Sequence, residues 1–279
     1  AVKVLRSATD QVRSNSARFA REQEVLKRLD SRGAARLVDA DLDNDPPWIA
    51  SEFIDGISLS ELIQRDGPLN NELTQALIFS LAGVVKNVHN AGIAHRDISP
   101  NNIILGADGP VLIDFGSSRL ESYDSQTGSR LFVGTDGYIA PEGLRGEPVG
   151  TSGDVYALTR VAQFCLTGLT PSPTDTDDWL SLFPELLRTA CVSALVALPK
   201  DRSNIDSLES AFSCDATIID SLDWVPRPIS KLPLRFKLRT VVAATTLVAL
   251  LVTTLFLILT PDRTVRTSNI IAKGFDQAF

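Results

Sequence analysis

Two short segments near the middle of the chain carry the residues best suited to chemistry. Residues 95–102 have the sequence HRDISPNN, and residues 114–116 have the sequence DFG. Together they supply two carboxylates, Asp97 and Asp114, and the amide oxygen of Asn102. Carboxylate and amide oxygens are hard ligands that suit Mg²⁺, and a carboxylate can also orient a hydroxyl nucleophile. These residue types therefore predict the chemistry of phosphoryl transfer.

The elements around these segments are expected to hold them in place. Residues 72–89 carry apolar side chains at helical spacing, and residues 103–113 predict a hairpin. The segment 95–102 lies between this helix and this hairpin, and Asp114 directly follows the second strand. A motif counts as more than a chance string only in such a structural context.

The N-terminal residues predict a strand and then a helix. Residues 1–5 contain a single lysine, Lys3, and a lone lysine on a strand usually faces solvent. Glu22, however, lies on the apolar face of the helix predicted at 18–29, and a carboxylate there needs a partner. Lys3 is the natural partner, whereas Glu24 points away from that face. Further expected elements are a strand at 48–54 and helices at 59–64, 153–167 and 179–198, the last interrupted near Pro184.

Composition and charge limit the class of protein. The chain has 279 residues, of which 44% are hydrophobic and 22% charged, as in an ordinary globular protein. The net charge of −7 argues against a nucleic-acid partner, because such a partner requires a basic face. The three cysteines are widely spaced and the two histidines lack zinc spacing, so we expect reduced thiols and no zinc site.

Seven motifs occur in a fixed order along the chain. They are AVK at 1–3, a helical Glu22, HRDxxxxN, DFG, GTxxYxAPE at 134–142, DVY at 154–156 and a late arginine, Arg202. This order resembles that of eukaryotic-type (Hanks-type) Ser/Thr protein kinases over residues 1–214. The resemblance implies an α+β, bilobal kinase fold with an incomplete N-terminal lobe and a mainly helical C-terminal lobe. It also implies transfer of the γ-phosphate of ATP to Ser or Thr hydroxyls of protein substrates.

The resemblance gives the motif residues their roles in catalysis. Asp97 would orient the acceptor hydroxyl and take its proton. Asn102 and Asp114 would hold Mg²⁺, or Mn²⁺ in its place. Lys3, fixed by an ion pair with Glu22, would position the α- and β-phosphates of ATP.

Further roles follow from the same resemblance. The backbone of Glu52 and Ile54 would hydrogen-bond to adenine, with the small Ser51 beside the nucleotide. Arg96 would pair with a phosphate on the Ser- and Thr-rich segment 117–133. The residues with structural roles would be His95, Glu142, Asp154 and Arg202, and Glu142 would pair with Arg202. Asp154 has two interpretations, because it could cap its helix or hydrogen-bond to the backbone of the catalytic loop.

Two features depart from the kinase pattern. Ser99 stands where Ser/Thr kinases usually carry a lysine that contacts the transferred phosphate. No Gly-rich loop precedes Lys3, so we expect an N-terminally truncated domain. These departures support an alternative, a catalytically impaired pseudokinase that acts as a membrane-tethered scaffold, but the presence of every base and metal residue argues against it. A small-molecule kinase of the aminoglycoside type shares an HxDxxxxN loop, but the GTxxYxAPE segment argues against it.

The C-terminal part predicts a membrane anchor. Residues 241–259 contain no charge and as a helix would span roughly 28 Å, close to the thickness of a bilayer core. Residues 227–239 carry five basic residues and no acid, which places the N-terminal side in the cytoplasm. No GxxxG motif supports self-association through this helix. We expect a single-pass plasma-membrane protein with a kinase domain at 1–214, a juxtamembrane linker at 215–239, a transmembrane helix at 240–260 and an extracytoplasmic stub at 261–279.

Overall fold

A computed structural model describes most of the predicted kinase domain. It covers residues 1–4, 12–29, 33–120, 134–172 and 177–214. The predicted linker, transmembrane helix and stub lie outside the described residues and stay predictions. Within the described ranges, none of the helices is long and apolar enough to cross a bilayer.

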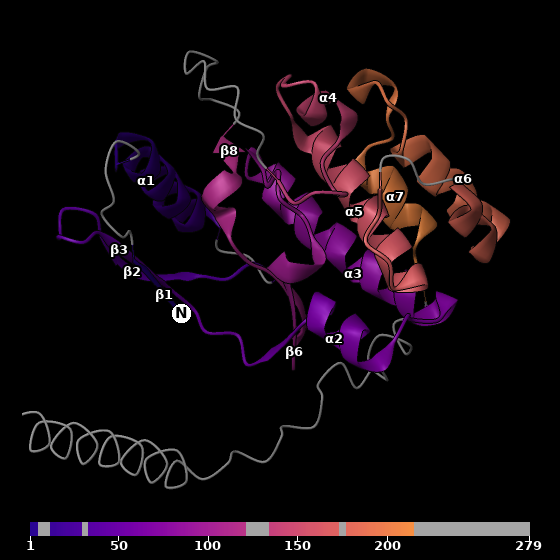
Figure 1. Ribbon diagram of the computed structural model, residues 1–279, viewed down its shortest axis with the longest axis horizontal. Coiled ribbons are helices and arrows are strands. Elements are labelled where there is room, and N and C mark those ends of the chain that lie inside the picture. Colours follow the sequence, from indigo (N-terminus) through magenta and orange to yellow (C-terminus); the bar gives the residue numbers. More distant parts are fainter. Residues whose placement is uncertain (5–11, 30–32, 121–133, 173–176, 215–279) are drawn as a thin grey trace, which may run out of the picture. The chain divides into compact units, whose positions relative to one another are not determined.

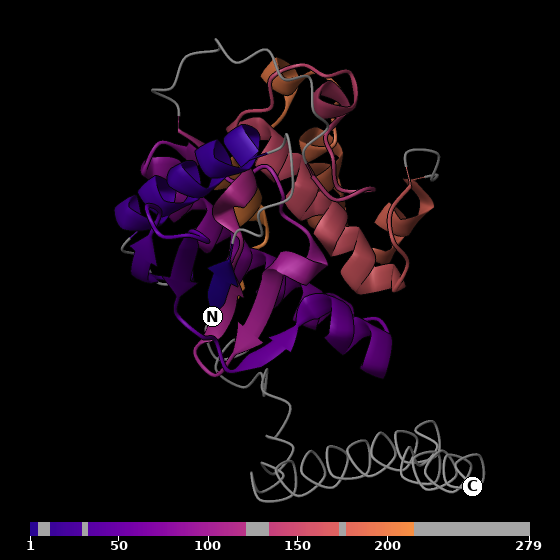
Figure 2. The same ribbon diagram turned by 60° about the vertical axis from the view of Figure 1, so that its left-hand side comes forward.

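The N-terminal part is a small antiparallel sheet covered by one helix. Strand β3 (Trp48–Ser51) lies in the middle of the sheet, between β1 (Val2–Val4) and β2 (Leu37–Asp41). Helix α1 (Val12–Arg28) lies beside these strands, as Figures 1 and 2 show. Its buried residues include Phe19, Val25 and Leu26, as the apolar spacing predicted.

The strand predicted at 48–54 is shorter than expected. Strand β3 ends at Ser51, and the backbone N–H of the next residue, Glu52, still donates to the carbonyl of Arg36 at 2.8 Å. Residues 52–55 then link β3 to β4 (Gly56–Ser58), a strand that the sequence did not predict. This linker carries the main-chain groups of the expected adenine contact.

The predicted hairpin is present and extends into a second sheet. Strands β6 (Ile103–Gly106) and β7 (Gly109–Leu112) pair with each other, and β4 pairs with the other edge of β6. Two short strands, β5 (Ile93–Ala94) and β8 (Arg119–Leu120), also pair with each other. The pairing of β5 with β8 brings together the chain entering the HRD segment and the chain leaving the DFG segment.

The C-terminal part is mainly helical and is built around one buried helix. In α5 (Thr151–Thr167), every residue from 153 to 166 is buried. An α-helix without a polar face must lie in a core, and α3 (Asn71–Asn90) and α7 (Ile205–Ala211) pack against it. Figure 1 shows these helices grouped together, away from α1. The other helices are α2 (Leu59–Asp66), α4 (Pro141–Leu144), α6 (Glu185–Ala194) and the 3₁₀ turns η1 (Pro100–Asn102), η2 (Phe115–Ser117), η3 (Asp177–Leu182) and η4 (Pro199–Asp201).

A buried ion pair joins the start of α4 to the turn before α7. The Arg202 guanidinium donates to both carboxylate oxygens of Glu142, at 2.8 and 2.9 Å. The same guanidinium donates to the carbonyl of Ser152 at 2.9 Å and to that of Val196 at 3.0 Å. The side chains of the pair are 0% and 1% exposed, so neither charge is compensated by water. This is the contact expected from the sequence, and it ties three chain segments together.

We expect Arg202→Met to lower the free energy of unfolding by about 3–5 kcal/mol, because it leaves the Glu142 carboxylate buried without a cation. Urea unfolding followed by circular dichroism measures this change. The matched control is Arg145→Met, which breaks an exposed pair with Glu147 and should leave the unfolding midpoint nearly unchanged. Equal effects of the two substitutions would contradict a structural role for the buried pair.

Candidate active site

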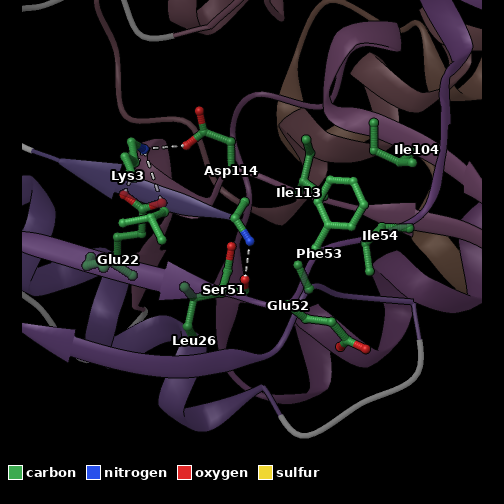
Figure 3. Close-up of a pocket in the computed structure, with 14 residues that line it drawn as sticks. Lys3, Glu22, Leu26, Ser51, Glu52, Phe53, Ile54, Ile104, Ile113 and Asp114 are labelled. Carbon is green, nitrogen blue, oxygen red and sulfur yellow. Dashed lines mark hydrogen bonds and ion pairs between the residues drawn. The ribbon is translucent and has the colours of Figure 1, made fainter. Parts of the chain in front are cut away.

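Lys3 joins two carboxylates that lie far apart in the sequence. Its Nζ atom is 2.9 Å from Glu22 Oε2 and 3.0 Å from Asp114 Oδ1 (Figure 3). Strand β1 supplies the lysine, α1 supplies Glu22, and Asp114 follows the end of β7. Glu24, the competing partner, instead contacts Arg28 on the exposed side of α1 at 3.0 Å. The expected pair of Lys3 and Glu22 is therefore present, and it extends to the DFG segment.

Burial and charge act in opposite directions on these groups. Burial tends to lower the pKa of Lys3, but the hydrogen bond and charge of Glu22, together with Asp114, outweigh it and raise the pKa. Burial also raises the pKa of Glu22, although Lys3 opposes this effect. Burial acts to raise the pKa of Asp114 too, but Lys3 and the Gly116 N–H outweigh it and lower the pKa. Lys3 is thus held as a cation between its two partners.

The lysine lies at one end of a cavity of about 310 Å³. Apolar side chains line the other end, where Figure 3 shows Ile54, Ile104 and Ile113 near the ring of Phe53. Among the described residues, no hydrogen bond takes the carbonyl of Glu52 or the N–H of Ile54. A flat base with a polar edge and an anionic tail would fit this combination of apolar walls, free main-chain groups and one cation.

The side chain of Asp97 is fixed by two neutral donors. Its Oδ1 atom accepts a hydrogen bond from the Thr135 hydroxyl at 2.7 Å. The Asn102 amide nitrogen donates to Asp97 Oδ2 at 3.1 Å and to its carbonyl at 2.8 Å. Both of these bonds use the amide nitrogen of Asn102, and no described hydrogen bond uses its amide oxygen. Thr135 was missed as a site residue, although the GT of the GTxxY motif pointed to it.

The Asp154 carboxylate holds the backbone of the HRD segment through hydrogen bonds. One carboxylate oxygen accepts from the N–H of His95 at 2.8 Å, and the other accepts from the N–H of Arg96 at 2.7 Å. The Nε2 atom of His89, another residue that sequence reasoning missed, is 2.8 Å from the same carboxylate. The capping interpretation was wrong, because α5 begins earlier, with Gly150 at the N-cap and no side-chain cap.

His95 is fully buried beneath this segment. Its ring meets the ring of Phe115 edge-on, with centroids 4.7 Å apart. The N–H of Asp97 lies 3.3 Å from Nδ1, and Nε2 lies 3.2 Å from the carbonyl of Ile113. A neutral ring with its proton on Nε2 satisfies both contacts. Burial lowers the pKa of His95, although nearby carboxylates oppose this effect.

A family model described as a protein kinase domain matches residues 1–210. The chain belongs to the protein kinase family. The resemblance drawn from the motif order is therefore confirmed, and so is a kinase-like fold of mixed strands and helices. The expected truncation before Lys3 stays a prediction.

The kinase domain is similar to several curated proteins with Ser/Thr kinase names. It is 34% identical to the probable serine/threonine-protein kinase PkwA of Thermomonospora curvata, over 77% of this chain and 30% of PkwA. It is 31% identical to AfsK of Streptomyces griseus, over 61% of this chain and 21% of AfsK. It is 34% identical to PknL of Mycobacterium tuberculosis, over 55% of this chain and 39% of PknL. The matches therefore span less than half the length of each relative.

The residues of this kinase domain fit the divalent metal that the family implies. The Asp114 side chain is 48% exposed, and its Oδ1 atom alone is engaged by Lys3 and the Gly116 N–H. Asn102 offers the amide oxygen that its contacts with Asp97 leave unused. The described residues contain no group of three His, Cys, Asp or Glu side chains that could form a complete metal cage. Mg²⁺ needs only one or two such ligands when phosphates complete its shell.

Arg96 takes an uncommon backbone conformation, with a φ of 69°. Its expected partner, a phosphate on the segment 117–133, falls largely on residues 121–133, which lie outside the described part. The pairing of Arg96 with an activating phosphate therefore stays a prediction.

We expect the kinase domain to lose stability as pH falls below 6.5, the ordinary pKa of histidine. Below that pH the unfolded chain binds a proton that buried His95 does not bind, because the folded state lowers its pKa. The free energy of unfolding should fall by up to about 1.4 kcal/mol per pH unit as the pH falls below 6.5, relative to His95→Gln. Urea unfolding at several pH values measures both proteins. Parallel pH profiles would contradict a neutral, buried His95.

Proposed function

We propose that this chain is a Ser/Thr protein kinase that transfers the γ-phosphate of ATP to protein hydroxyls. The contact of Lys3 with both Glu22 and Asp114 carries the proposal. It joins residues 111 positions apart, so the lysine that would contact the phosphates lies next to the carboxylate that would hold the metal. Similarity to proteins named as Ser/Thr kinases also supports it.

In the proposed reaction, the acceptor hydroxyl attacks the γ-phosphorus in line with the bond to ADP. Asp97 orients the hydroxyl and takes its proton as the new P–O bond forms and the bond to the β-γ bridging oxygen breaks. Thr135 and Asn102 keep the Asp97 carboxylate in one orientation, which lowers the entropy cost of reaching the transition state. Mg²⁺, held by Asn102 and Asp114, would neutralise charge on the phosphates.

Binding of ATP follows from the same groups. The carbonyl of Glu52 and the N–H of Ile54 are available for the edge of adenine, next to the apolar side chains of Ile104 and Ile113. Lys3 would contact the α- and β-phosphates while Glu22 keeps it in place. Ser51 also lines the cavity, and its small side chain leaves room beside the base.

We further propose that residues 240–260 anchor the kinase in the plasma membrane, with residues 1–214 in the cytoplasm. The support is the uncharged stretch 241–259 and the excess of basic residues on its N-terminal side. Membrane attachment would restrict the kinase to substrates that reach the membrane surface.

We expect Asp97→Asn to reduce phosphate transfer at least about 100-fold, because the amide cannot accept the proton of the hydroxyl. The measurement is transfer of radiolabelled phosphate from ATP to a generic Ser/Thr acceptor protein, using the intact chain. The control, Asp108→Asn, changes an exposed carboxylate in the turn between β6 and β7 and should leave transfer unchanged. Transfer by Asp97→Asn at the rate of the unsubstituted protein would contradict the assignment. ATP binding without transfer in the unsubstituted protein would favour the scaffold.

We expect the intact chain to stay with membranes after extraction at alkaline pH. Replacing Leu247 and Leu251 together by arginine should release it, because each arginine adds about 3 kcal/mol to the cost of insertion. The control replaces Leu232, outside the uncharged stretch, by arginine. Release of the unsubstituted protein by alkali would contradict the anchor.

A further inference from the structure

Helix α6 carries apolar side chains on two opposite sides. The helix packs against α5, and its buried residues are Leu187, Cys191 and Ala194. The exposed side carries Leu186 and Val192, with Thr189 between them on the helix surface. A surface helix usually turns charged residues to the solvent, and a helix that is apolar on every side is normally enclosed. The outer side of α6 therefore has the composition of a surface that another molecule covers.

Exposed leucines continue beyond both ends of this helix. Leu182 precedes α6 and Leu198 follows it, and both side chains are half-exposed. Leu186 is the most exposed of the set, at 68%. Together with Thr189 and Val192, these three leucines are here called the α6 face. It lies at the outer edge of the helical part, away from α1 (Figure 1). Exposed apolar side chains that gather in this way mark a surface that contacts a protein or a membrane.

The polar residues of α6 do not oppose burial of this face. The Thr189 hydroxyl donates to the carbonyl of Glu185 at 2.9 Å, and the Ser193 hydroxyl donates to that of Ala190 at 2.8 Å. Covering these hydroxyls therefore leaves no donor without a partner. Glu185 and Arg188 are the only charged residues of α6, and their charges cancel. The helix thus presents an outer side without net charge and without unsatisfied donors.

The last described residues lie beside one end of the α6 face. Asn71 and Gln75 occupy successive turns of α3. The Asn71 side chain donates to the carbonyl of Leu182 at 2.7 Å, and the Gln75 side chain donates to that of Ser213 at 3.0 Å. One turn of an α-helix rises about 5.4 Å, so the chain leaves the described domain close to Leu182.

We propose that the α6 face contacts the surface of the lipid bilayer. This inference rests on the proposed membrane anchor and adds a docking surface to it. The predicted linker, residues 215–239, reaches at most about 90 Å even when fully extended. A tether of this length keeps the α6 face at a high local concentration near the bilayer, so a weak contact with lipid suffices.

An apolar face without net charge suits the boundary between lipid headgroups and acyl chains. Leucine and valine side chains are stabilised there by the apolar area that they bury. Asp177 and Asp178 precede the α6 face in η3, and their charge opposes attraction to anionic headgroups. The contact therefore depends on apolar insertion. None of the residues that line the cavity beside Lys3 lies on α6, so docking leaves the ATP site open.

The first experiment places a fluorescent label on the α6 face of the intact chain. Leu186→Cys is labelled with nitrobenzoxadiazole in a Cys214→Ser background, because Cys165 and Cys191 are buried. The protein is reconstituted into phosphatidylcholine vesicles that contain lipids with brominated acyl chains, which quench the label on contact. The matched control is Val38→Cys on β2, where the side chain is also 68% exposed. We expect quenching at least about 3-fold stronger at position 186 than at position 38. Equal quenching at the two positions would overturn the proposal.

A charged substitution tests whether the apolar side chains make the contact. Leu186→Asp is read with the label at Val192→Cys, and quenching should fall about 3-fold or more, because a carboxylate opposes entry into the acyl region. The control Val38→Asp should leave quenching of the same label unchanged. Urea unfolding of Leu186→Asp should match that of the unsubstituted protein, because the replaced side chain is exposed. Full quenching in Leu186→Asp would contradict the docking.

Lipid composition and salt distinguish apolar insertion from headgroup binding. Quenching at position 186 should be similar in phosphatidylcholine vesicles and in vesicles that also contain phosphatidylglycerol. It should also persist in about 0.5 M NaCl, because salt screens charges and not apolar contacts. Quenching that requires the anionic lipid and disappears in salt would rule out insertion of the α6 face.

Two further readouts separate the docking from the anchor and from self-association. Flotation of the unsubstituted chain with vesicles tests the anchor, and its failure would contradict the anchor and the docking together. Flotation without quenching at position 186 would contradict the docking alone. Oxidation of Leu186→Cys to a covalent dimer, without quenching by lipid, would show that a second copy covers the α6 face and would also overturn the proposal.

Discussion

The buried carboxylate of Asp154 holds the HRD segment in a backbone conformation that it would not adopt alone. Arg96 has a φ of 69°, which costs a non-glycine residue about 1–3 kcal/mol. Two backbone N–H groups and the ring of His89 satisfy the carboxylate, and these bonds offset that cost. The direction in which Asp97 leaves the segment follows from this conformation. The position of Asp97, the proposed base, therefore depends on Asp154, which lies on the buried helix α5.

Two ion pairs of the domain show how burial distinguishes a structural charge pair from charges that lie at the site. Arg202 and Glu142 are both almost fully buried, and backbone carbonyls take the remaining donors of the guanidinium, so their contact has one stable form. Lys3 is half-exposed and is shared between the buried Glu22 and the exposed Asp114. Burial raises the pKa of Glu22, so that carboxylate depends on the lysine, while the bond to Asp114 can be exchanged for another anion. A cation with one fixed and one exchangeable partner suits a site that binds phosphates.

Sequence patterns predicted those parts of the fold and site where a residue type had one physical explanation. Glu22 on an apolar helix face required a cation, and the long apolar run of α5 required a core. Strand β2 escaped prediction because it is short and carries two acids, Asp39 and Asp41, a residue type that strands disfavour. Thr135 and His89 were missed because a hydroxyl or an imidazole reveals its partner only when distant segments meet. Asp154 was ambiguous for the same reason, since the start of its helix depends on packing and not on a local cap.

The position of Asp154 on α5, far along the sequence from the HRD segment, also has a consequence for folding during synthesis. Asp154 is made 57 residues after Asp97, and Arg202 a further 48 residues later. At a synthesis rate of about 5–20 residues per second, roughly 3–11 seconds pass between the synthesis of the HRD segment and that of Asp154. During that interval Asp154 is not yet present to accept the hydrogen bond from the N–H of Arg96. The nascent domain would therefore acquire its strands and α3 first, and the geometry of its active site only when α5 leaves the exit tunnel.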